Sequence, residues 1–247
     1  MSATRKRERD VVEEKSKRQL RADRILAAAA ELTERWGYQK TTIDDIARQA
    51  GVAKGTIYLH WKTREDLFMA MLLREQLSMA RVLKDKILGD PEGVLLHGMF
   101  KHALIVLEDY PLIKAVFLLD SNLLGDLLTT NLVTANLAQQ KLIFFENYFR
   151  YLREKGLLRI DKDIQSQIYQ FSAITIGYML IDQFFPKAYH RPAVEVAEMA
   201  SQTLKQLLEP EEPISPELME VVRKDFHEKL EFYLTAMVQQ IEKAIEI

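Results

Sequence analysis

The chain has 247 residues, of which 34 are Lys or Arg and 36 are Asp or Glu, and its formal net charge is -2. It contains no cysteine, which excludes a disulfide framework, a thiolate zinc site and a cysteine nucleophile. Nine glycines and seven prolines are too few for the many turns of a β-sandwich or barrel, so the composition favours long helices. Taken over the whole chain, a charge near zero argues against a nucleic-acid partner.

The sequence carries no recognisable targeting segment. Basic residues are frequent in 1–10, but they are not followed by the apolar run of about 7–15 residues that a secretory signal requires. No stretch approaches the roughly 18 uninterrupted apolar residues of a transmembrane helix. We therefore expect a soluble, cytoplasmic protein with no membrane partner.

A charged lead-in precedes the first helical pattern. Residues 1–24 hold nine basic and five acidic side chains, and we expect 1–19 to be a basic flexible arm. From Leu20 onward apolar residues recur at the spacing of a helix. This first helix is expected to end at Gly37, which suits a C-terminal cap. Its apolar face is formed by Ile25, Ala29, Leu32 and Trp36.

Two short helices follow, and a longer one comes after them. Thr42 is placed to cap the first short helix, which ends at Gly51. The second short helix is expected over about 53–60, and Thr63 is placed to cap a longer helix that runs to about Leu88.

The remainder of the chain also reads as helical. The patterns cover 91–109, 111–120, 122–155, 163–185, 192–208 and 216–246, and no segment alternates as a β-strand does. The fold class is therefore all-α, with an N-terminal three-helix head on a larger helical body. We assign 20–66 to a helix-turn-helix domain, 67–209 to the body, and 210–247 to a linker and an extra amphipathic helix.

The stretch 41–67 carries the functional signal. Two short helices joined by a tight Gly51-Val52 turn are typical of a helix-turn-helix, whose second helix enters the DNA major groove. An ordinary pair of surface helices would show the same periodicity. Charge favours DNA, because residues 1–62 carry a net +5 and residues 63–247 a net -7.

The motif resembles the N-terminal domain of TetR/AcrR-type bacterial transcriptional regulators. The resemblance rests on TTIDDIARQAGVAKGTIY at 41–58 and HWKTREDL at 60–67, with further similarity at 24–29 and 36–38. It covers about residues 20–70. It implies a two-fold homodimer whose heads contact successive major grooves of a palindromic operator.

Position by position, the resemblance implies roles for eight residues in DNA binding. The phosphate anchors are Thr42 and Tyr58, the residues close to the bases are Lys54, Gly55 and Thr56, and the backbone contacts are His60, Lys62 and Arg64. Three positions depart from the usual family pattern. Ala53 and Leu59 each remove an expected phosphate contact, whereas Trp61 is a conservative change in the core.

The resemblance also implies an effector pocket in the body. A small, largely apolar effector would bind there, change the spacing of the two heads and release DNA, so that the protein acts as a repressor. For each aromatic residue, core packing is the plainer interpretation. The candidate ligand-binding residues are His102, Phe117, Asn147, Tyr148, Tyr169, Tyr178 and Asp182.

The resemblance further implies a dimer interface in which two late helices pack as a four-helix bundle, and the candidates here are 163–185 and 192–208. The apolar stripe of 216–246 must be buried somewhere, either in a dimer interface or over the effector body.

We weigh this repressor against two alternatives. An enzyme is disfavoured, because the five histidines show no metal-binding spacing and no phosphate-binding loop or nucleophile motif is present. We expect no cofactor and no metal. The other alternative is a DNA-binding structural or protein-interaction protein of the same fold with no effector. A pocket of several hundred Å³ in the body would favour the repressor.

Overall fold

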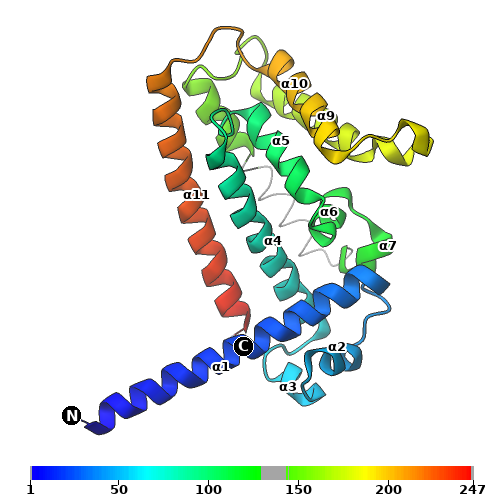
Figure 1. Cartoon of the computed structure of the whole chain (residues 1–247), viewed down its shortest axis with the longest axis vertical. Helices are drawn as coiled ribbons and strands as arrows, with labels where there is room; N and C mark the ends of the chain where they lie inside the picture. Colours follow the sequence, from blue (N-terminus) through cyan, green and yellow to red (C-terminus); the bar gives the residue numbers. More distant parts are fainter. Residues whose placement is uncertain (1, 129–142, 144, 246–247) are drawn as a thin grey trace.

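The computed structural model describes residues 2–128, 143 and 145–245, with side chains from residue 17 onward. The described residues contain helices and connecting turns without any β-strand, so the all-α prediction is confirmed. A small N-terminal head lies at one end of the molecule, and a long helix, α4, runs from it into the body (Figure 1).

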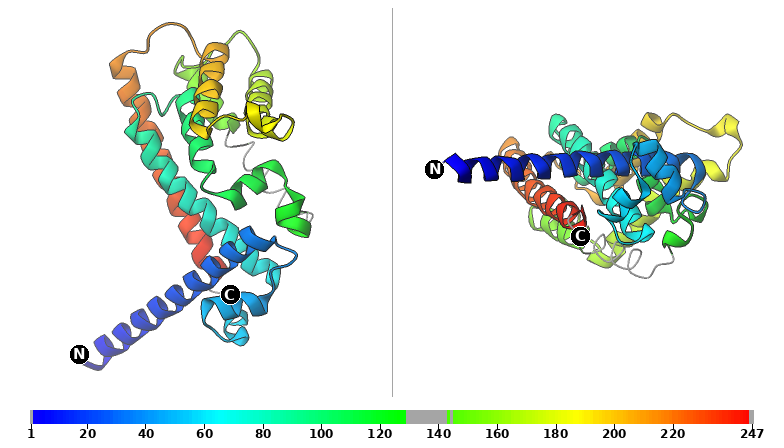
Figure 2. Two further views of the ribbon diagram at one scale, coloured as in Figure 1. Left: turned by 45° about the vertical axis from the view of Figure 1, so that its right-hand side comes forward. Right: turned by 90° about the horizontal axis from the view of Figure 1, so that it is seen from below.

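The head is built from α1 (Ser2–Trp36), α2 (Ile43–Ala50) and α3 (Lys54–Tyr58). Residues 2–19 of the arm expected over 1–19 are helical, because α1 begins at Ser2. No Gly or Pro occurs before Gly37, and Arg, Lys, Glu and Ala are strong helix formers. The first part of α1 projects away from the rest of the molecule (Figure 2).

The body begins with α4 (Arg64–Gly89), α5 (Leu96–Leu107) and α6 (Pro111–Leu118), each close to its predicted range. The helix predicted over 122–155 is interrupted, because α7 (Ser121–Leu124) passes at Gly125 into the 3-10 turn η1 (Gly125–Leu128). Gly125 has a φ of 50°, which a helix does not allow. Residues 129–142 and 144 lie outside the described residues, and residues 145–154 are helical.

The late helices of the body are α9 (Ile164–Leu180) and α10 (Ala193–Leu208). The pattern predicted over 163–185 stops earlier than expected, since two 3-10 turns, η2 (Ile181–Gln183) and η3 (Lys187–Tyr189), follow α9. Helix α10 packs mainly along α5 and also contacts α9.

Two large hydrophobic cores, and a small third one at Leu104, Ala197 and Ala200, are present among the described residues. The first joins the head to the N-terminal half of α4 and to α6 and α7, and contains Ile25, Trp61 and Phe68 among its large buried side chains. The second lies in the upper body around Phe149 and Phe171. Because the first core extends along α4 to Leu77, the head does not end at residue 66 as its predicted boundary implies.

The last helix, α11 (Pro216–Ile245), lies along α4 and returns to the head (Figures 1 and 2). Val222 and Phe226 are buried in the second core, whereas Met237 and Ile241 are buried in the first. The predicted apolar stripe is therefore buried against α4 within the same chain.

Candidate DNA-binding site

A tight turn sets the angle between α2 and α3. Gly51 adopts a φ of 64°, in the left-handed region that glycine tolerates at no cost, and its N–H contacts the carbonyls of Ala47 and Arg48. Val52 N–H then donates to Ala47 O at 3.0 Å. These bonds end α2 and direct the chain into α3 within three residues, as in a helix-turn-helix.

Both helices of the motif are anchored from beneath. Ile43 and Ile46 of α2 are buried, and so are Ile57 of α3 and Trp61 after it. The prediction that Trp61 occupies the core is confirmed, since the ring is fully buried in the first core. A rigid base of this kind holds the opposite face of α3 in a fixed orientation.

Thr42 starts α2, as predicted. Its Oγ1 accepts a hydrogen bond from the Asp45 N–H at 3.2 Å and lies 2.5 Å from Asp45 Oδ2. Substitution of such a cap costs about 1 kcal/mol. Thr42 remains exposed, so its predicted contact with a phosphate is sterically open.

The exposed face of α3 carries the residues predicted to lie near the bases. Lys54 and Gly55 are exposed and Thr56 is half-buried. A Cβ atom added at Gly55 would meet nothing within 4 Å, so the space above this residue is open. Because glycine has no side chain, DNA could approach the backbone of α3 closely at this position. Tyr58 is 47% exposed and Leu59 69%.

Lys54 is not free on this face. Its Nζ lies 2.8 Å from Asp44 Oδ2, across the turn from α2 to α3. The hydrogen bond to Asp44 raises the pKa of the Lys54 ammonium. The two residues are ten positions apart on different helices, so helix periodicity could not indicate that they pair. Asp44 is therefore a residue that the motif analysis missed.

His60 is not available to DNA in this structure, contrary to the sequence prediction. The side chain is 1% exposed, its Nδ1 has no hydrogen-bond partner among the described residues, and the ring lies 5.2 Å from that of Trp61. The chain leaves α3 through His60 toward the core. Burial, followed by the charges of Arg18 and Arg21, lowers the pKa of His60, so the buried ring is neutral at pH 7.

Arg64 also serves the head rather than projecting from it. Its Nη2 donates to the carbonyl oxygens of Tyr38 and Thr41, the second at 3.2 Å. The guanidinium carbon lies 3.8 Å from the centre of the Tyr38 ring and 4.9 Å from that of Phe68. The predicted backbone contact by Arg64 is therefore replaced by a clamp on the loop between α1 and α2. Lys62, by contrast, is exposed.

This arrangement can bind a polyanion through α3 and its flanks. Helix α3 rests on buried side chains and presents Lys54, Thr56 and the open position at Gly55 on its outer face. Lys62 lies just after the end of the helix. The width of the major groove admits one such helix.

The comparisons with known proteins agree with this geometry. The sequence model of "Bacterial regulatory proteins, tetR family" matches residues 25–71, which contain the C-terminal part of α1, all of α2 and α3, and the start of α4. The N-terminal head of this chain is therefore similar to that of bacterial regulatory proteins of the tetR family.

The matched segment is short relative to known TetR/AcrR proteins. The fatty acid metabolism regulator protein of Bacillus subtilis is 45% identical over 47 residues, which are 19% of this chain and 24% of the relative. QacR of Staphylococcus aureus is 41% identical over 54 residues, which are 22% of this chain and 29% of the relative. The chain thus aligns with less than a third of either relative.

Solved TetR/AcrR structures share the fold over most of the chain. A complex of SmeT with triclosan gives a TM-score of 0.58 at 21% identity, covering 79% of this chain and 99% of SmeT. SmeT is described as the repressor of a multidrug efflux pump of Stenotrophomonas maltophilia. FadR of Bacillus subtilis in complex with stearoyl-CoA gives 0.53 at 20% identity, covering 73% of this chain and 96% of FadR.

Among the described residues, the candidate ligand-binding side chains lie in different surroundings. Asn147, Tyr169 and Asp182 are exposed. Tyr148 is buried, and its hydroxyl donates to the carbonyl oxygen of Val94. The assignment of these residues to an effector site therefore stays a prediction.

Three more of these candidates are engaged or scattered. His102 Nε2 lies 2.8 Å from Asp90 Oδ2, and Tyr178 OH lies 3.1 Å from Thr203 Oγ1. Phe117 is partly exposed on α6. Burial opposes ionisation of Asp90, but the hydrogen bonds with His102 and with the Glu92 N–H, together with the charges of His102 and Lys101, outweigh it and lower the pKa of the carboxyl group.

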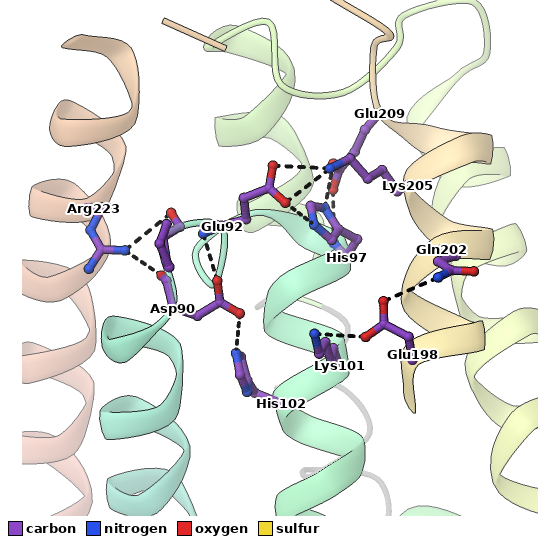
Figure 3. Close-up of polar contacts among 11 residues, drawn as sticks. Asp90, Glu92, His97, Lys101, His102, Glu198, Gln202, Lys205, Glu209 and Arg223 are labelled. Carbon is purple, nitrogen blue, oxygen red and sulfur yellow. Dashed lines mark hydrogen bonds and ion pairs between the residues drawn. The ribbon is translucent and has the colours of Figure 1, made fainter. Parts of the chain in front are cut away.

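The body does contain a cavity of about 250 Å³, between α5, α10 and the turn before α5. Ion pairs cross it: Lys205 Nζ lies 3.1 Å from Glu92 Oε2, and Lys101 Nζ lies 2.9 Å from Glu198 Oε2 (Figure 3). It is lined by Asp90, Glu92, His97, Gly98, Lys101, Glu198, Ser201, Gln202 and Lys205. None of the seven predicted residues lines it.

Beside this cavity, Glu209 from the end of α10 closes the start of α5. Its Oε1 accepts from the His97 N–H at 2.9 Å, and its Oε2 lies 2.7 Å from His97 Nδ1. The carboxylate is 4% exposed. It occupies the helix N-terminus, where negative charge is favoured.

Proposed function

We propose that this protein is a sequence-specific DNA-binding transcriptional regulator that acts as a repressor. The observation that carries the proposal is the exposed polar face of α3 on a buried helix-turn-helix base, within the segment that matches the tetR family. In this proposal α3 enters the major groove, where Lys54, Gly55 and Thr56 lie near the bases. Thr42, Tyr58 and Lys62 meet phosphates.

The regulator is proposed to act as a homodimer on a palindromic operator. Apolar side chains are exposed along α9 and α10, among them Tyr169, Ile176, Val194 and Met199. A second copy would cover them in a four-helix bundle, which supports dimerisation through these helices. Light scattering coupled to size exclusion tests this: a dimer that becomes monomeric in an Ile176→Glu variant is expected.

A small effector is proposed to bind the body and release the operator. SmeT with triclosan and FadR with stearoyl-CoA support ligand binding in this fold. The charged lining of the cavity at α5 and α10 favours an effector that carries polar groups over the largely apolar one expected from sequence. Mass spectrometry of the purified protein under native conditions would detect a retained ligand.

The alternative is a DNA-binding structural or protein-interaction protein of the same fold with no effector. The scattered positions of the seven candidate ligand-binding residues favour this alternative.

No catalytic role enters either version, since the named relatives are regulators. Among the described residues no helix is long and apolar enough to cross a membrane. The proposal places the protein with DNA in the cytoplasm.

The deciding experiment is sequencing of DNA fragments selected by the purified protein from a random library. A palindromic consensus with two half-sites about one helical turn apart is expected. Affinity for it should fall steeply with salt, because each neutralised phosphate releases counterions. No enrichment, or binding that does not change with salt, would refute the proposal.

A further inference from the structure

We propose that α11 is an intramolecular strap, which fastens α4 at both ends and so holds the DNA-binding head at one angle to the body. The proposal rests on the proposed DNA-binding function for its consequence, but its structural part can be tested without DNA. It gives a regulatory role to the segment after residue 210, which lies outside the match to the tetR family at 25–71.

At the body end, α11 caps the end of α4. Arg223 Nη1 donates to Asp90 O at 2.6 Å and to Pro91 O at 3.3 Å, and its Nη2 donates to Leu88 O (Figure 3). The last carbonyls of a helix have no partner within that helix. Arg223 supplies partners from another helix, so the end of α4 and the turn after it are attached to α11.

Along the middle, two polar contacts set the register between the helices. Lys84 Nζ of α4 lies 2.8 Å from Glu231 Oε1 of α11, and Gln76 Nε2 donates to Tyr233 OH at 3.3 Å. Exposed contacts of this kind add little stability individually. Because Gln76 and Lys84 lie in different turns of α4, the two contacts together favour a single register of α11 along α4.

At the head end, α11 enters the first core. Leu234, Met237, Ile241 and Ile245 are buried there with Ile25 of α1 and Leu67 at the start of α4. Arg18 Nη2 of α1 also donates to Ile245 O at 3.4 Å. The helix that begins at the body therefore ends in contact with the head.

This placement gives α11 control over rotation of the head. If the head rotated relative to the body, α11 could not keep both of its end contacts. It would lose either the packing of its C-terminal part in the first core or the hydrogen bonds from Arg223 to the carbonyl oxygens at the end of α4. Either loss exposes buried apolar surface or leaves carbonyls unpaired, so the strap favours one head position. Freeing one end of α11 would broaden the population of head positions.

The body end of the strap also adjoins the cavity. The turn held by Arg223 includes Asp90, whose side chain lines the cavity, while Glu92 of the same turn is paired with Lys205 across it (Figure 3). A molecule that displaced these pairs would act on the same turn that α11 holds. The strap thus connects this turn to the head.

The test uses the full chain and exploits its lack of cysteine. Cysteines introduced as Lys40→Cys in the head and Glu154→Cys in the body, both exposed positions, carry spin labels for distance measurement. Excess unlabelled chain isolates the distance within one protomer. The variant is Ile241→Ser, in the buried face of α11, and its matched control is Phe232→Ser, since Phe232 is 80% exposed on the same helix.

We expect one narrow distance distribution for the parent chain and for Phe232→Ser, and a broader one for Ile241→Ser. Affinity for selected DNA should fall at least about fivefold in Ile241→Ser, a typical size for coupling between sites. Arg223→Gln, which frees the opposite end without cutting the core, should broaden the distribution as well. It serves as the deciding variant if Ile241→Ser loses helical circular dichroism.

Three outcomes would overturn the proposal: narrow distributions in both variants while they remain folded, equal broadening in Phe232→Ser, or a broader distribution with unchanged DNA affinity. Failure of the parent chain to bind any DNA refutes the proposed function instead. In that case the distance distributions still decide whether α11 holds the head.

Discussion

Lys54 on α3 and Asp44 on α2 form an ion pair, with 2.8 Å between Nζ and Oδ2, on the face proposed to meet DNA. The carboxylate would lie close to phosphates and opposes their approach. Removing its charge in Asp44→Asn should tighten binding to all sequences by several-fold at low salt, and by less at high salt because ions screen the charge. Fluorescence anisotropy at two salt concentrations measures this. Asp161→Asn, far along the chain in the body, is the control.

Lys54 itself should govern sequence preference. Lys54→Ala removes a donor proposed to reach base edges, and one good base contact contributes about 1–3 kcal/mol of discrimination. Library selection with the variant should give a consensus that is relaxed at one symmetric pair of positions. A uniform loss of affinity with an unchanged consensus would contradict a base-proximal Lys54.

Lys62 should act on all sequences alike. It is exposed just after α3, so Lys62→Ala is expected to weaken binding uniformly and to reduce the slope of log affinity against log salt by about one for each protomer, or about two for the proposed dimer. The slope is obtained by titrating the selected DNA and one scrambled sequence over a range of salt. A larger loss on the selected sequence than on the scrambled one would argue that Lys62 reads bases.

His60 should make the head sensitive to acid. Burial, with Arg18 and Arg21, lowers its pKa below the ordinary 6.5. The unfolded chain therefore takes up a proton in a pH range where the folded head does not. Stability from this group is complete above about pH 6.5 and is lost as pH falls toward the lowered pKa. His60→Gln, which cannot titrate, should flatten the fall in melting temperature between pH 7 and pH 5. An equal fall in both proteins would assign it to other groups.

Glu209 should contribute to the stability of the body. Glu209→Ala leaves the buried His97 N–H and Nδ1 without their carboxylate partner, at a cost of about 2–3 kcal/mol. Urea unfolding measures the change, with Glu211→Ala as the control, because Glu211 is exposed in the following linker. A difference below about 0.5 kcal/mol between the two variants would show that the pair contributes little.

Local sequence signals predicted the head well. Gly51, the caps at Thr42 and Thr63, and the apolar stripe of α2 act through neighbours a few residues away, so spacing alone located the helix-turn-helix. His60 and Arg64 escaped prediction because their roles depend on α1 and on the loop before α2. A resemblance to DNA-contacting positions could not reveal that their side chains turn inward.

The body was less predictable for the same reason. Which faces of α5, α9 and α10 meet depends on packing between segments as far apart as His97 and Glu209. The sequence nonetheless required α11 to bury its stripe, and only the structure identified α4 as the helix that covers it.

The clamp formed by Arg64 has a consequence for dissecting this protein into fragments. Arg64 lies in the first turn of α4, yet it binds the loop between α1 and α2, and Phe68 and Met71 of the same helix fill the first core. No linker therefore separates the two halves of the molecule, and a fragment ending at residue 66 would lack part of its own interior. An isolated DNA-binding fragment that folds would have to include α4 to at least Leu77, together with a substitute for the end of α11.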